Sequence, residues 1–277
     1  MNSAHSYIIN GDFNQVITPL DRGFSYGDGV FRTMLMRNGQ PECWPLHYQK
    51  LVADCAAIGI VCPSAELLMN DMQQLISIKE LTDNLSSVIK VIITRGEGER
   101  GYAVPAVTNP TRVIVKSAMP SYAKENFVIG VNLHVCKTRL AVQTKLAGIK
   151  HLNRLENVMA RMEWHDENIF DGVMLDQYEN VIECTMSNIF ARFDKVLVTP
   201  DLSQCGVAGM TRQRIMGLVS SLNLTVEVEA LPLKKLTQAD EVIICNSLYG
   251  AFQVSKIGQN TWSLQSLAKN IRNLLSS

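Results

Sequence analysis

The chain has 277 residues, a length near the size at which one core tends to split into two domains. Hydrophobic residues make up 47% of it and charged residues 19%, with 26 Lys and Arg against 26 Asp and Glu, which disfavours a disordered chain and any electrostatic role on nucleic acids or membrane surfaces. No window approaches the roughly 18 apolar residues of a membrane-spanning helix, and no basic leader precedes an apolar run at the N-terminus, so we expect a cytoplasmic protein.

The strands of the first half predict an α+β domain. Residues 6–20 are expected to form a strand pair that turns at "NGD", and the Asn-Gly pair in "GVFRTMLMRNGQPECW" predicts a second hairpin. The runs "SSVIKVIITRG" and "TRVIVKSAM" are rich in β-branched residues and should pair in the same sheet.

Two helices are expected between these strands. The first begins at Pro45, ends near Gly59 and has four apolar positions, Leu46, Leu51, Ala53 and Ile58. The second, "SAELLMNDMQQLISI", has Ser64 as its candidate N-cap.

Residues 120–127 contain a proline and several polar residues, and they are expected to link a domain over residues 1–119 to one over residues 128–277. Many short strands and few helices predict a barrel-like second domain; the strands include "GVMLD", "VIECT", "IFARF" and "KVLVTP". One helix is expected from Thr211 to Leu222. Another should begin at Leu152, where apolar residues recur every three or four positions, at Leu152, Leu155, Met159 and Met162.

Neither the cysteines nor the histidines form a metal-binding pattern. The five histidines lack H-x-x-x-H spacing, so no metal site is expected. The seven cysteines are never spaced as C-x-x-C and are interpreted as reduced core residues: Cys43, Cys55, Cys62, Cys136, Cys184, Cys205 and Cys245.

The segment "GEGERG", residues 96–101, matches the G-x-G-x-x-G dinucleotide fingerprint but not its context. Such a motif should open a helix and be followed about 20 residues later by an acidic residue. Here Pro105 and Pro110 follow, and no acidic residue occurs between Arg100 and Glu125. A glycine-rich substrate-binding loop or a plain strand connection is the better interpretation.

A series of residues in the second half is ordered as in a known enzyme family. Lys150 is followed by "VIECTMSNIF", "VLVTP" and "GVAGMTRQR", which contain Glu183, Thr185, Asn188, Phe190, Thr199, Gly209, Met210 and Arg212. This order resembles the signature of the class IV aminotransferases, which are fold-type-IV pyridoxal 5'-phosphate enzymes. The resemblance implies a mixed α/β protein similar to D-amino-acid aminotransferase, with a small N-terminal α/β domain, a larger barrel-like C-terminal domain and a homodimeric assembly.

The same resemblance implies the roles of single residues. Lys150 would bind the cofactor covalently and serve as the catalytic base, and Glu183 would pair with the ring nitrogen. Partial burial lowers the pKa of a lysine, and a carboxylate keeps the ring nitrogen protonated so that the ring can accept electrons. The other cofactor-binding candidates are Asn188, Met210, Thr211, Ser247 and Lys50. Taken singly, each of these residues more often has an ordinary structural role, and their joint order favours the site.

Three segments resemble the aminodeoxychorismate lyases more than other members of the family: "RGEGERGY", "LAGIKHLNRLEN" and "ADEVIICNSL". This implies conversion of 4-amino-4-deoxychorismate to 4-aminobenzoate and pyruvate, a step of folate synthesis. Tyr26 and Phe31, in "DRGFSYGDGVFRTM", are expected to face the ligand. Arg100 is the candidate for a substrate carboxylate, because a guanidinium binds one in a bidentate manner; a solvated arginine on a mobile loop is the alternative.

Two departures from the family pattern matter. Lys50 stands where the family has an arginine that grips the phosphate, and lysine lacks the planar fork. Phe24 and Ser25 stand where some lyases place a threonine, so Ser25 or water would have to serve as a proton donor. His151 is either a packed neighbour of Lys150 or an acid-base group.

Two other functions remain open at this point. The first is a transaminase for D-amino acids or branched-chain amino acids, which would use the same Lys150 and Glu183. The second is a non-catalytic protein that has kept the fold.

Overall fold

The computed structural model describes residues 6–76 and 86–276, and these fall into two compact units. The first unit comprises the residues up to Pro120 together with Lys150–Asn153, and the second comprises Ser121–Ile149 and the residues from Arg154 onward. The sequence did not suggest that four residues of the second half would return to the first unit. Each unit has its own sheet and is described separately.

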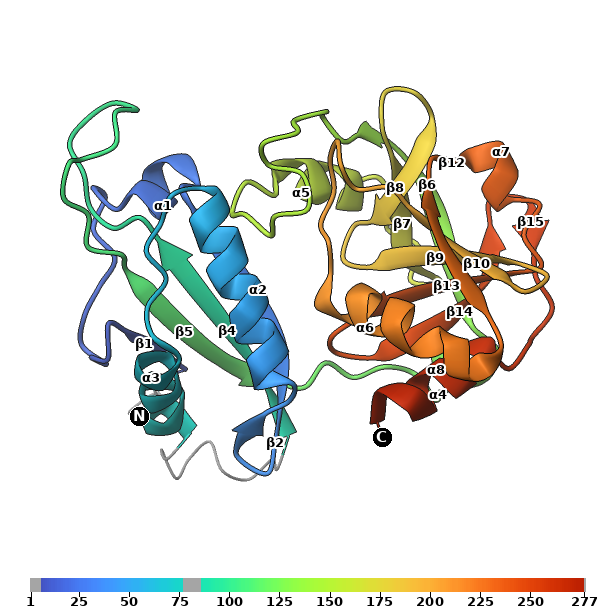
Figure 1. Cartoon of the computed structure of the whole chain (residues 1–277), viewed down its shortest axis with the longest axis horizontal. Helices are drawn as coiled ribbons and strands as arrows, with labels where there is room; N and C mark the ends of the chain where they lie inside the picture. The colour runs from blue at the N-terminus through green and yellow to red at the C-terminus, as the bar shows by residue number, and fades with distance from the viewer. Residues whose placement is uncertain (1–5, 77–85, 277) are drawn as a thin grey trace. The chain divides into compact units, whose positions relative to one another are not determined.

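The first unit is built on a five-stranded antiparallel sheet (Figure 1). Its order is β1 (Tyr7–Ile9), β5 (Arg112–Ala118), β4 (Ser86–Thr94), β2 (Gly29–Arg37) and β3 (Gln40–Pro41). Asn38 and Gly39 connect β2 to β3 with φ angles of 51° and 74°, which confirms the predicted hairpin. The predicted pairing of β4 with β5 is also confirmed.

The predicted strand pair over residues 6–20 is confirmed only at its turn. The chain reverses at Asn10 and Gly11, where Ile9 and Asp12 form an antiparallel bridge, but no second strand follows, and β1 pairs with β5 instead. The turn at Asn10 is held by β5, since the Asn10 amide donates to the Arg112 carbonyl at 2.9 Å and the Asn10 side chain accepts from the Arg112 amide at 3.0 Å. Beyond Asp12, residues 13–20 form no strand.

The helices of the first unit are α1 (Arg22–Tyr26), α2 (Trp44–Ala57), which packs on β2, and α3 (Ala65–Ile76), which packs on β1 and β5. Ser64 is the N-cap of α3, because its Oγ accepts from the Leu67 amide at 3.2 Å. The last two residues predicted for this helix, 77 and 78, lie outside the described residues.

The buried side of α2 differs from the predicted apolar stripe. Leu46 and Ala53 are exposed, whereas the helix buries His47, Leu51, Asp54 and Cys55. Asp54 can be buried because cations pair with it, as described below.

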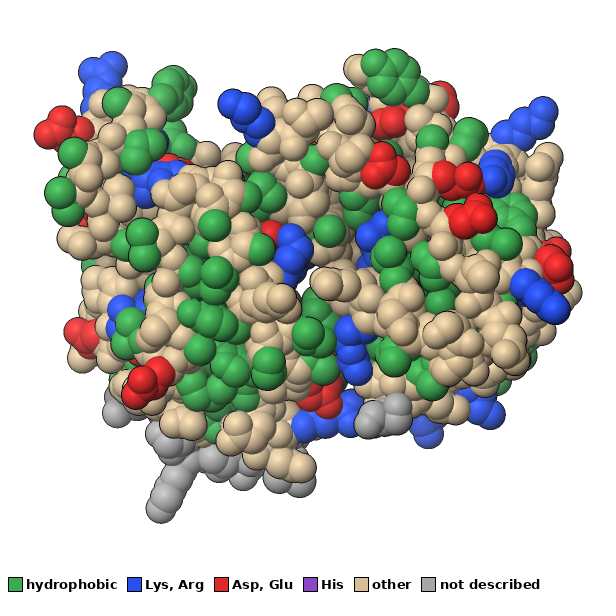
Figure 2. All heavy atoms as spheres, in the orientation of Figure 1, with side chains coloured by type: hydrophobic (Ala, Val, Ile, Leu, Met, Phe, Trp, Pro, Cys, Tyr) green, Lys and Arg blue, Asp and Glu red, His purple; other side chains and the backbone are tan. Residues whose placement is uncertain are grey.

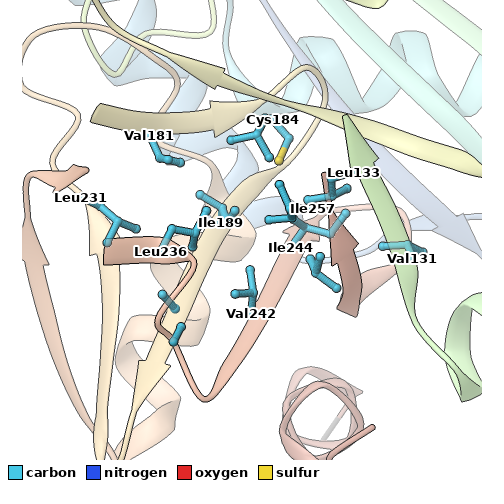
Figure 3. Packing of buried hydrophobic residues seen from close by; sticks show 14 of the residues in the cluster. Val131, Leu133, Val181, Cys184, Ile189, Leu231, Leu236, Val242, Ile244 and Ile257 are labelled. Carbon is cyan, nitrogen blue, oxygen red and sulfur yellow. The ribbon is translucent and has the colours of Figure 1, made fainter. Parts of the chain in front are cut away.

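The second unit contains a larger sheet that curls into a nearly closed barrel, as predicted (Figure 1). Its order is β11 (Thr225–Glu229), β10 (Val196–Pro200), β9 (Asn188–Phe193), β13 (Glu241–Asn246), β14 (Gly250–Ile257), β6 (Val131–Arg139), β7 (Ile169–Leu175), β8 (Asn180–Cys184) and β12 (Leu231–Pro232), with β15 (Asn260–Thr261) paired to β14. Side chains from opposite parts of this sheet fill its interior, including Val181, Ile189, Leu231 and Ile244 (Figure 3).

The helices of the second unit are α4 (Lys124–Val128), α5 (Leu155–Arg161), α6 (Met210–Leu218), α7 (Leu233–Leu236) and α8 (Leu267–Ser276). A 3-10 turn, Val219–Leu222, extends α6 to the predicted end of that helix. Helices α6 and α8 pack together, α6 against β13 and α8 against β14. Part of the segment expected as a link lies in α4, where the Phe127 ring is 4.7 Å from the Phe252 ring.

The prediction for the helix after Lys150 needs two corrections. The helix begins at Leu155, because the chain at Leu152 is still bound to β2, where the Leu152 amide donates to the Gly29 carbonyl at 3.0 Å. Its apolar side faces outward: Leu155, Val158, Met159 and Met162 are between 53% and 69% exposed. The polar side is anchored instead, with Asn157 Nδ2 donating to the Thr185 carbonyl at 3.0 Å.

Among the described residues, no helix is long and apolar enough to cross a membrane. On the face seen in Figure 2, positive and negative side chains are interspersed, in keeping with the balanced composition. All seven cysteines are free thiols; five are buried, and Cys43 and Cys62 are partly exposed.

Candidate functional site

In the first unit, the main chain of Lys150 is held from both sides. The Phe31 amide of β2 donates to the Lys150 carbonyl at 2.9 Å, and the Lys150 amide donates to Asp54 Oδ2 at 3.3 Å. His151 forms a β-bridge with Val30, so the segment lies against the start of β2 like a short extra strand. These bonds fix the point from which the Lys150 side chain extends.

The ring of Phe31 lies beside two lysine side chains. Lys150 Nζ is 4.7 Å from the ring centroid, and Lys90 Nζ, from β4, is 4.6 Å from it. Burial lowers the pKa of Lys90. Phe31 therefore contacts the predicted catalytic lysine. Lys90 was not predicted as part of this site, because a single polar residue in a β-branched strand carries no signal of function.

Asp54 is the centre of a buried charge cluster on α2. Its carboxylate, 1% exposed, pairs with the Arg32 guanidinium and the Lys50 ammonium. Burial lowers the pKa of Arg32 and of Lys50, and the attraction of Asp54 opposes both shifts. The predicted phosphate-binding residue Lys50 is thus attached to an anion within its own unit.

Sequence reading missed Asp54 and Arg32, although signals for both exist. Lys50 and Asp54 stand four positions apart on a predicted helix, the spacing of an ion pair. Arg32 interrupts the apolar run of β2 at a position whose neighbours Val30 and Met34 are buried. A cation at such a position needs a buried partner.

The remaining candidates of the first unit lie in α1 or in the loop between β4 and β5. The Gly101 amide donates to the Tyr26 hydroxyl at 3.2 Å, and Arg22 donates to the carbonyls of Gly101, Tyr102 and Ala103. Arg100 lies exposed in this loop. Ser25 Oγ donates to the Pro19 carbonyl at 2.7 Å.

In the second unit, Glu183 is a buried carboxylate at the end of β8. It is 4% exposed, and its Oε2 accepts from the Val207 amide at 2.8 Å. Burial lowers the pKa of Arg154, at the start of α5, while the charge of Glu183 raises it. Arg154 was not predicted as part of the site. A cation at a helix N-terminus is unfavourable beside the positive end of the helix dipole, so its presence there indicates an anionic partner nearby.

Asn188 of β9 holds the loop that precedes α6. Its Nδ2 donates to the Val207 carbonyl at 2.8 Å, and its Oδ1 accepts from the Gly209 amide at 3.1 Å. A Cβ on Gly209 would lie 2.2 Å from Asn188 Oδ1, so only glycine fits here. The same loop provides the Val207 amide that binds Glu183, and Asn188 therefore links the loop to the carboxylate.

The start of α6 presents the groups expected of an anion site. Gly209 is its N-cap without a side-chain hydrogen bond, so the amides of the first turn precede any acceptor within the helix. Thr211 Oγ1 and Ser247 Oγ lie 3.3 Å apart beside this turn. Arg212 fixes the helix to β10 by donating to Thr199 Oγ1 at 3.0 Å and to the Pro200 carbonyl at 2.9 Å.

Within the described part of the chain, no group of three His, Cys, Asp or Glu side chains is placed to hold a metal ion.

The family model for amino-transferase class IV matches residues 29–257. An aminodeoxychorismate lyase of Vibrio harveyi is 38% identical over 250 residues, 90% of each chain. The crystal structure of 4-amino-4-deoxychorismate lyase from Pseudomonas aeruginosa is 37% identical, has a TM-score of 0.90 and covers 97% of each chain. A D-alanine aminotransferase of Listeria monocytogenes is 30% identical over 230 residues, 82% of this chain and 77% of the relative.

Removing one partner of the Asp54–Arg32 pair should destabilise the protein more than removing both. Asp54→Leu leaves Arg32 buried without its anion and should lower the free energy of unfolding, measured by urea titration, by about 3–5 kcal/mol. Adding Arg32→Met to that variant should restore at least half of the loss. As a control, Glu42→Leu breaks the exposed Arg37–Glu42 pair and should cost less than about 1 kcal/mol. A double variant no more stable than Asp54→Leu would contradict the pairing.

Proposed function

Because the chain belongs to the class IV aminotransferase family, whose members depend on pyridoxal 5'-phosphate, we propose that it is a lyase that converts 4-amino-4-deoxychorismate to 4-aminobenzoate and pyruvate. One observation carries this choice within the family. The lyases of Vibrio harveyi and Pseudomonas aeruginosa are 38% and 37% identical over at least 90% of this chain, against 30% over 82% for the D-alanine aminotransferase.

The residues present fit the cofactor. The N-terminus of α6, with Met210, Thr211 and Ser247, offers amides and hydroxyls of the kind that bind a phosphate. Glu183 offers a buried carboxylate for the ring nitrogen, and Asn188 keeps the supporting loop in place. When bound, the cofactor supplies a ring that accepts the electrons left when a proton is removed from the carbon bearing the substrate amine.

Lys150 is the residue to which we assign the proton transfer. Its Nζ would first hold the cofactor covalently and, once displaced by the substrate amine, take the proton from the amine-bearing carbon. The anchored main chain keeps this amine at the end of a fixed tether. Loss of the enolpyruvyl group then makes the substrate ring aromatic, which drives the reaction forward.

Other substrate contacts follow from the same proposal. Arg100 is the candidate for a substrate carboxylate, on a loop that Arg22 and Tyr26 hold at its backbone. Ser25 is a weaker candidate for a proton donor, because its hydroxyl already donates to the Pro19 carbonyl. Water is then the simpler donor.

A transaminase acting on D-amino acids is the second candidate, favoured by the 30% identity to the D-alanine aminotransferase. The two functions differ in what simple amino acids do to the bound cofactor. A transaminase converts it stoichiometrically to the pyridoxamine form, whereas the lyase leaves it as pyridoxal phosphate.

The reaction itself is the first test. Purified protein with pyridoxal phosphate should convert 4-amino-4-deoxychorismate to equimolar 4-aminobenzoate and pyruvate, measured together by chromatography and a coupled pyruvate assay. Lys150→Ala should lower the rate by roughly 10³-fold or more, since it removes the base. Lys145→Ala, on an exposed lysine of the second unit, is the control and should keep the rate. Stoichiometric pyridoxamine formation without 4-aminobenzoate would favour the transaminase.

Lys50 makes a second prediction. Its single ammonium pairs with Asp54, whereas an arginine can bind Asp54 and a phosphate with separate N–H groups. Lys50→Arg should therefore tighten pyridoxal phosphate binding by about threefold to tenfold in a fluorescence titration. Lys145→Arg should have no effect. An unchanged dissociation constant for Lys50→Arg would remove Lys50 from the phosphate site.

Two glycines near α6 provide a matched pair. Gly209→Ala places a Cβ against Asn188 and should weaken pyridoxal phosphate binding at least about tenfold. Gly217→Ala, in the same helix, meets no atom within 4 Å and should leave binding unchanged while stabilising the helix by about 0.5–1 kcal/mol. Equal effects of the two substitutions on binding would contradict a role of the Gly209 loop in the site.

We also propose a homodimer, for which the exposed apolar side of α5 is the supporting observation. Val158 and Met162 lie on that side, and the double change Val158→Glu with Met162→Glu should convert a dimer to a monomer in light scattering after size exclusion. Leu264→Glu, at an exposed leucine outside α5, should leave the dimer intact. A double variant that stays dimeric would place the interface elsewhere.

A cytoplasmic location is proposed from the seven free thiols.

A further inference from the structure

A carboxylate of the second unit, that of Asp171 in β7, is completely buried. Asp171 is 0% exposed. Its Oδ1 accepts from the Gly172 amide at 2.8 Å, from the Thr185 amide at 3.0 Å and from Thr185 Oγ1 at 2.5 Å. Its Oδ2 accepts from Ser187 Oγ at 2.7 Å. Three of these four bonds come from a single turn, residues 185–187, between β8 and β9.

The turn at residues 185–187 joins two residues of the candidate site. Glu183 is the last residue but one of β8, and Asn188 is the first residue of β9. The Cys184 amide closes the turn by donating to the Ser187 carbonyl at 2.7 Å. Bonds that fix this turn therefore also fix the strand ends from which Glu183 and Asn188 extend.

The hydrogen bonds continue from Ser187 to a second turn. Ser187 Oγ lies 2.5 Å from the Tyr249 hydroxyl, and because Ser187 gives its own proton to Asp171, the Tyr249 hydroxyl is the donor. Tyr249 belongs to the connection between β13 and β14, which also contains Ser247. Ser247 is the hydroxyl beside Thr211 at the start of α6. One chain of hydrogen bonds thus links Asp171 to both turns.

A buried carboxylate with these partners restricts the shape of the turn. Burial raises the pKa of Asp171, and the hydrogen bonds from Ser187 and Thr185 oppose that shift. The donors can satisfy the carboxylate only while the turn keeps its present shape. Loss of the carboxylate would leave buried donors unpaired, which is costly and allows the turn to seek other partners.

We propose that Asp171 is a positioning residue that sets the geometry of the cofactor-binding groups in the second unit. It fixes the turn that joins Glu183 to Asn188 by direct hydrogen bonds. By way of Tyr249 it also fixes the turn that bears Ser247. The inference rests on the proposed function only in that these groups bind pyridoxal phosphate, and it does not depend on which reaction follows.

The neighbouring hairpin provides a matched control. Asp176 directly follows β7, is 5% exposed and accepts from the amides of Tyr178 and Asn180 at 2.8 and 2.9 Å. It therefore holds the turn between β7 and β8 in the way that Asp171 holds the turn between β8 and β9. The turn at Asp176 carries none of the candidate site residues.

The test compares pyridoxal phosphate binding, measured by fluorescence titration of the full chain, with stability in urea. Asp171→Ala should weaken binding at least about tenfold, and Asp176→Ala should change it less than about twofold, although both should lower the urea midpoint. Asp171→Asn should bind within about threefold of the wild type. An amide oxygen still accepts from Gly172 and Thr185, and the amide nitrogen donates to Ser187 Oγ.

Ser187→Ala is a milder change that tests the proposal even if Asp171→Ala does not fold. It removes a donor to Asp171 and the acceptor of Tyr249 without altering a charge, and it should weaken binding about threefold to tenfold. It should also move the pH midpoint of the cofactor's absorbance change upward. Glu183 would hold the ring nitrogen less well, and less positive charge on the ring favours protonation of the nitrogen that links it to the protein. Asp176→Ala should leave that midpoint unchanged.

Equal effects of Asp171→Ala and Asp176→Ala on binding would overturn the proposal, and so would wild-type binding by Ser187→Ala. A wild type that binds pyridoxal phosphate without releasing 4-aminobenzoate would contradict the proposed reaction, and the titrations would still decide the role of Asp171. A wild type that binds no pyridoxal phosphate would contradict both.

Discussion

The anchoring of the Lys150 main chain is the constraint on which the account of this protein rests. A lysine side chain has four rotatable bonds. Its amine therefore has a defined position only if the backbone that carries it is fixed. Here the carbonyl of Lys150 is bound by β2 and its amide by Asp54. Asp54 can serve in this buried place because Arg32 and Lys50 balance its charge. The sheet of the first unit, helix α2 and the charge cluster thus act together on one residue.

In the second unit, one loop contacts several of the candidate residues. A single loop before α6 donates the Val207 amide to Glu183, contacts Asn188 through Val207 and Gly209, and leads into the helix N-terminus. Glycine at position 209 is required by the approach of Asn188. One segment therefore places both a buried carboxylate and a helix N-terminus, the two groups that we propose bind the ring nitrogen and the phosphate of the cofactor.

Much of the architecture follows from the sequence because it depends on local patterns. The Asn38–Gly39 turn, the Ser64 cap and the helix at Met210 are consequences of residues close in the chain, and the pairing of β4 with β5 follows from two β-branched runs. The class of the second domain follows from the spacing of its short strands. The family was predicted from the order of Lys150, Glu183 and the start of α6, and the family model that matches residues 29–257 confirms the family.

What could not be predicted depends on contacts between distant segments. Met159 and Met162 have the spacing of a buried face, yet they are exposed. Helical periodicity shows that one face of a helix is apolar, but it does not show which segment covers that face. Asp54 is buried with two cations as partners, and one of them, Arg32, comes from another element. The return of Lys150–Asn153 to the first unit likewise needs the pairing with β2, which no local pattern indicates.

Chemical trapping of the cofactor on the protein tests most directly whether Lys150 binds it. Borohydride reduction of the protein loaded with pyridoxal phosphate, followed by peptide mapping, should place a phosphopyridoxyl group on Lys150 at close to one per chain. A group found mainly on Lys50, Lys90 or Lys145, or none on the folded protein, would contradict the assignment of Lys150.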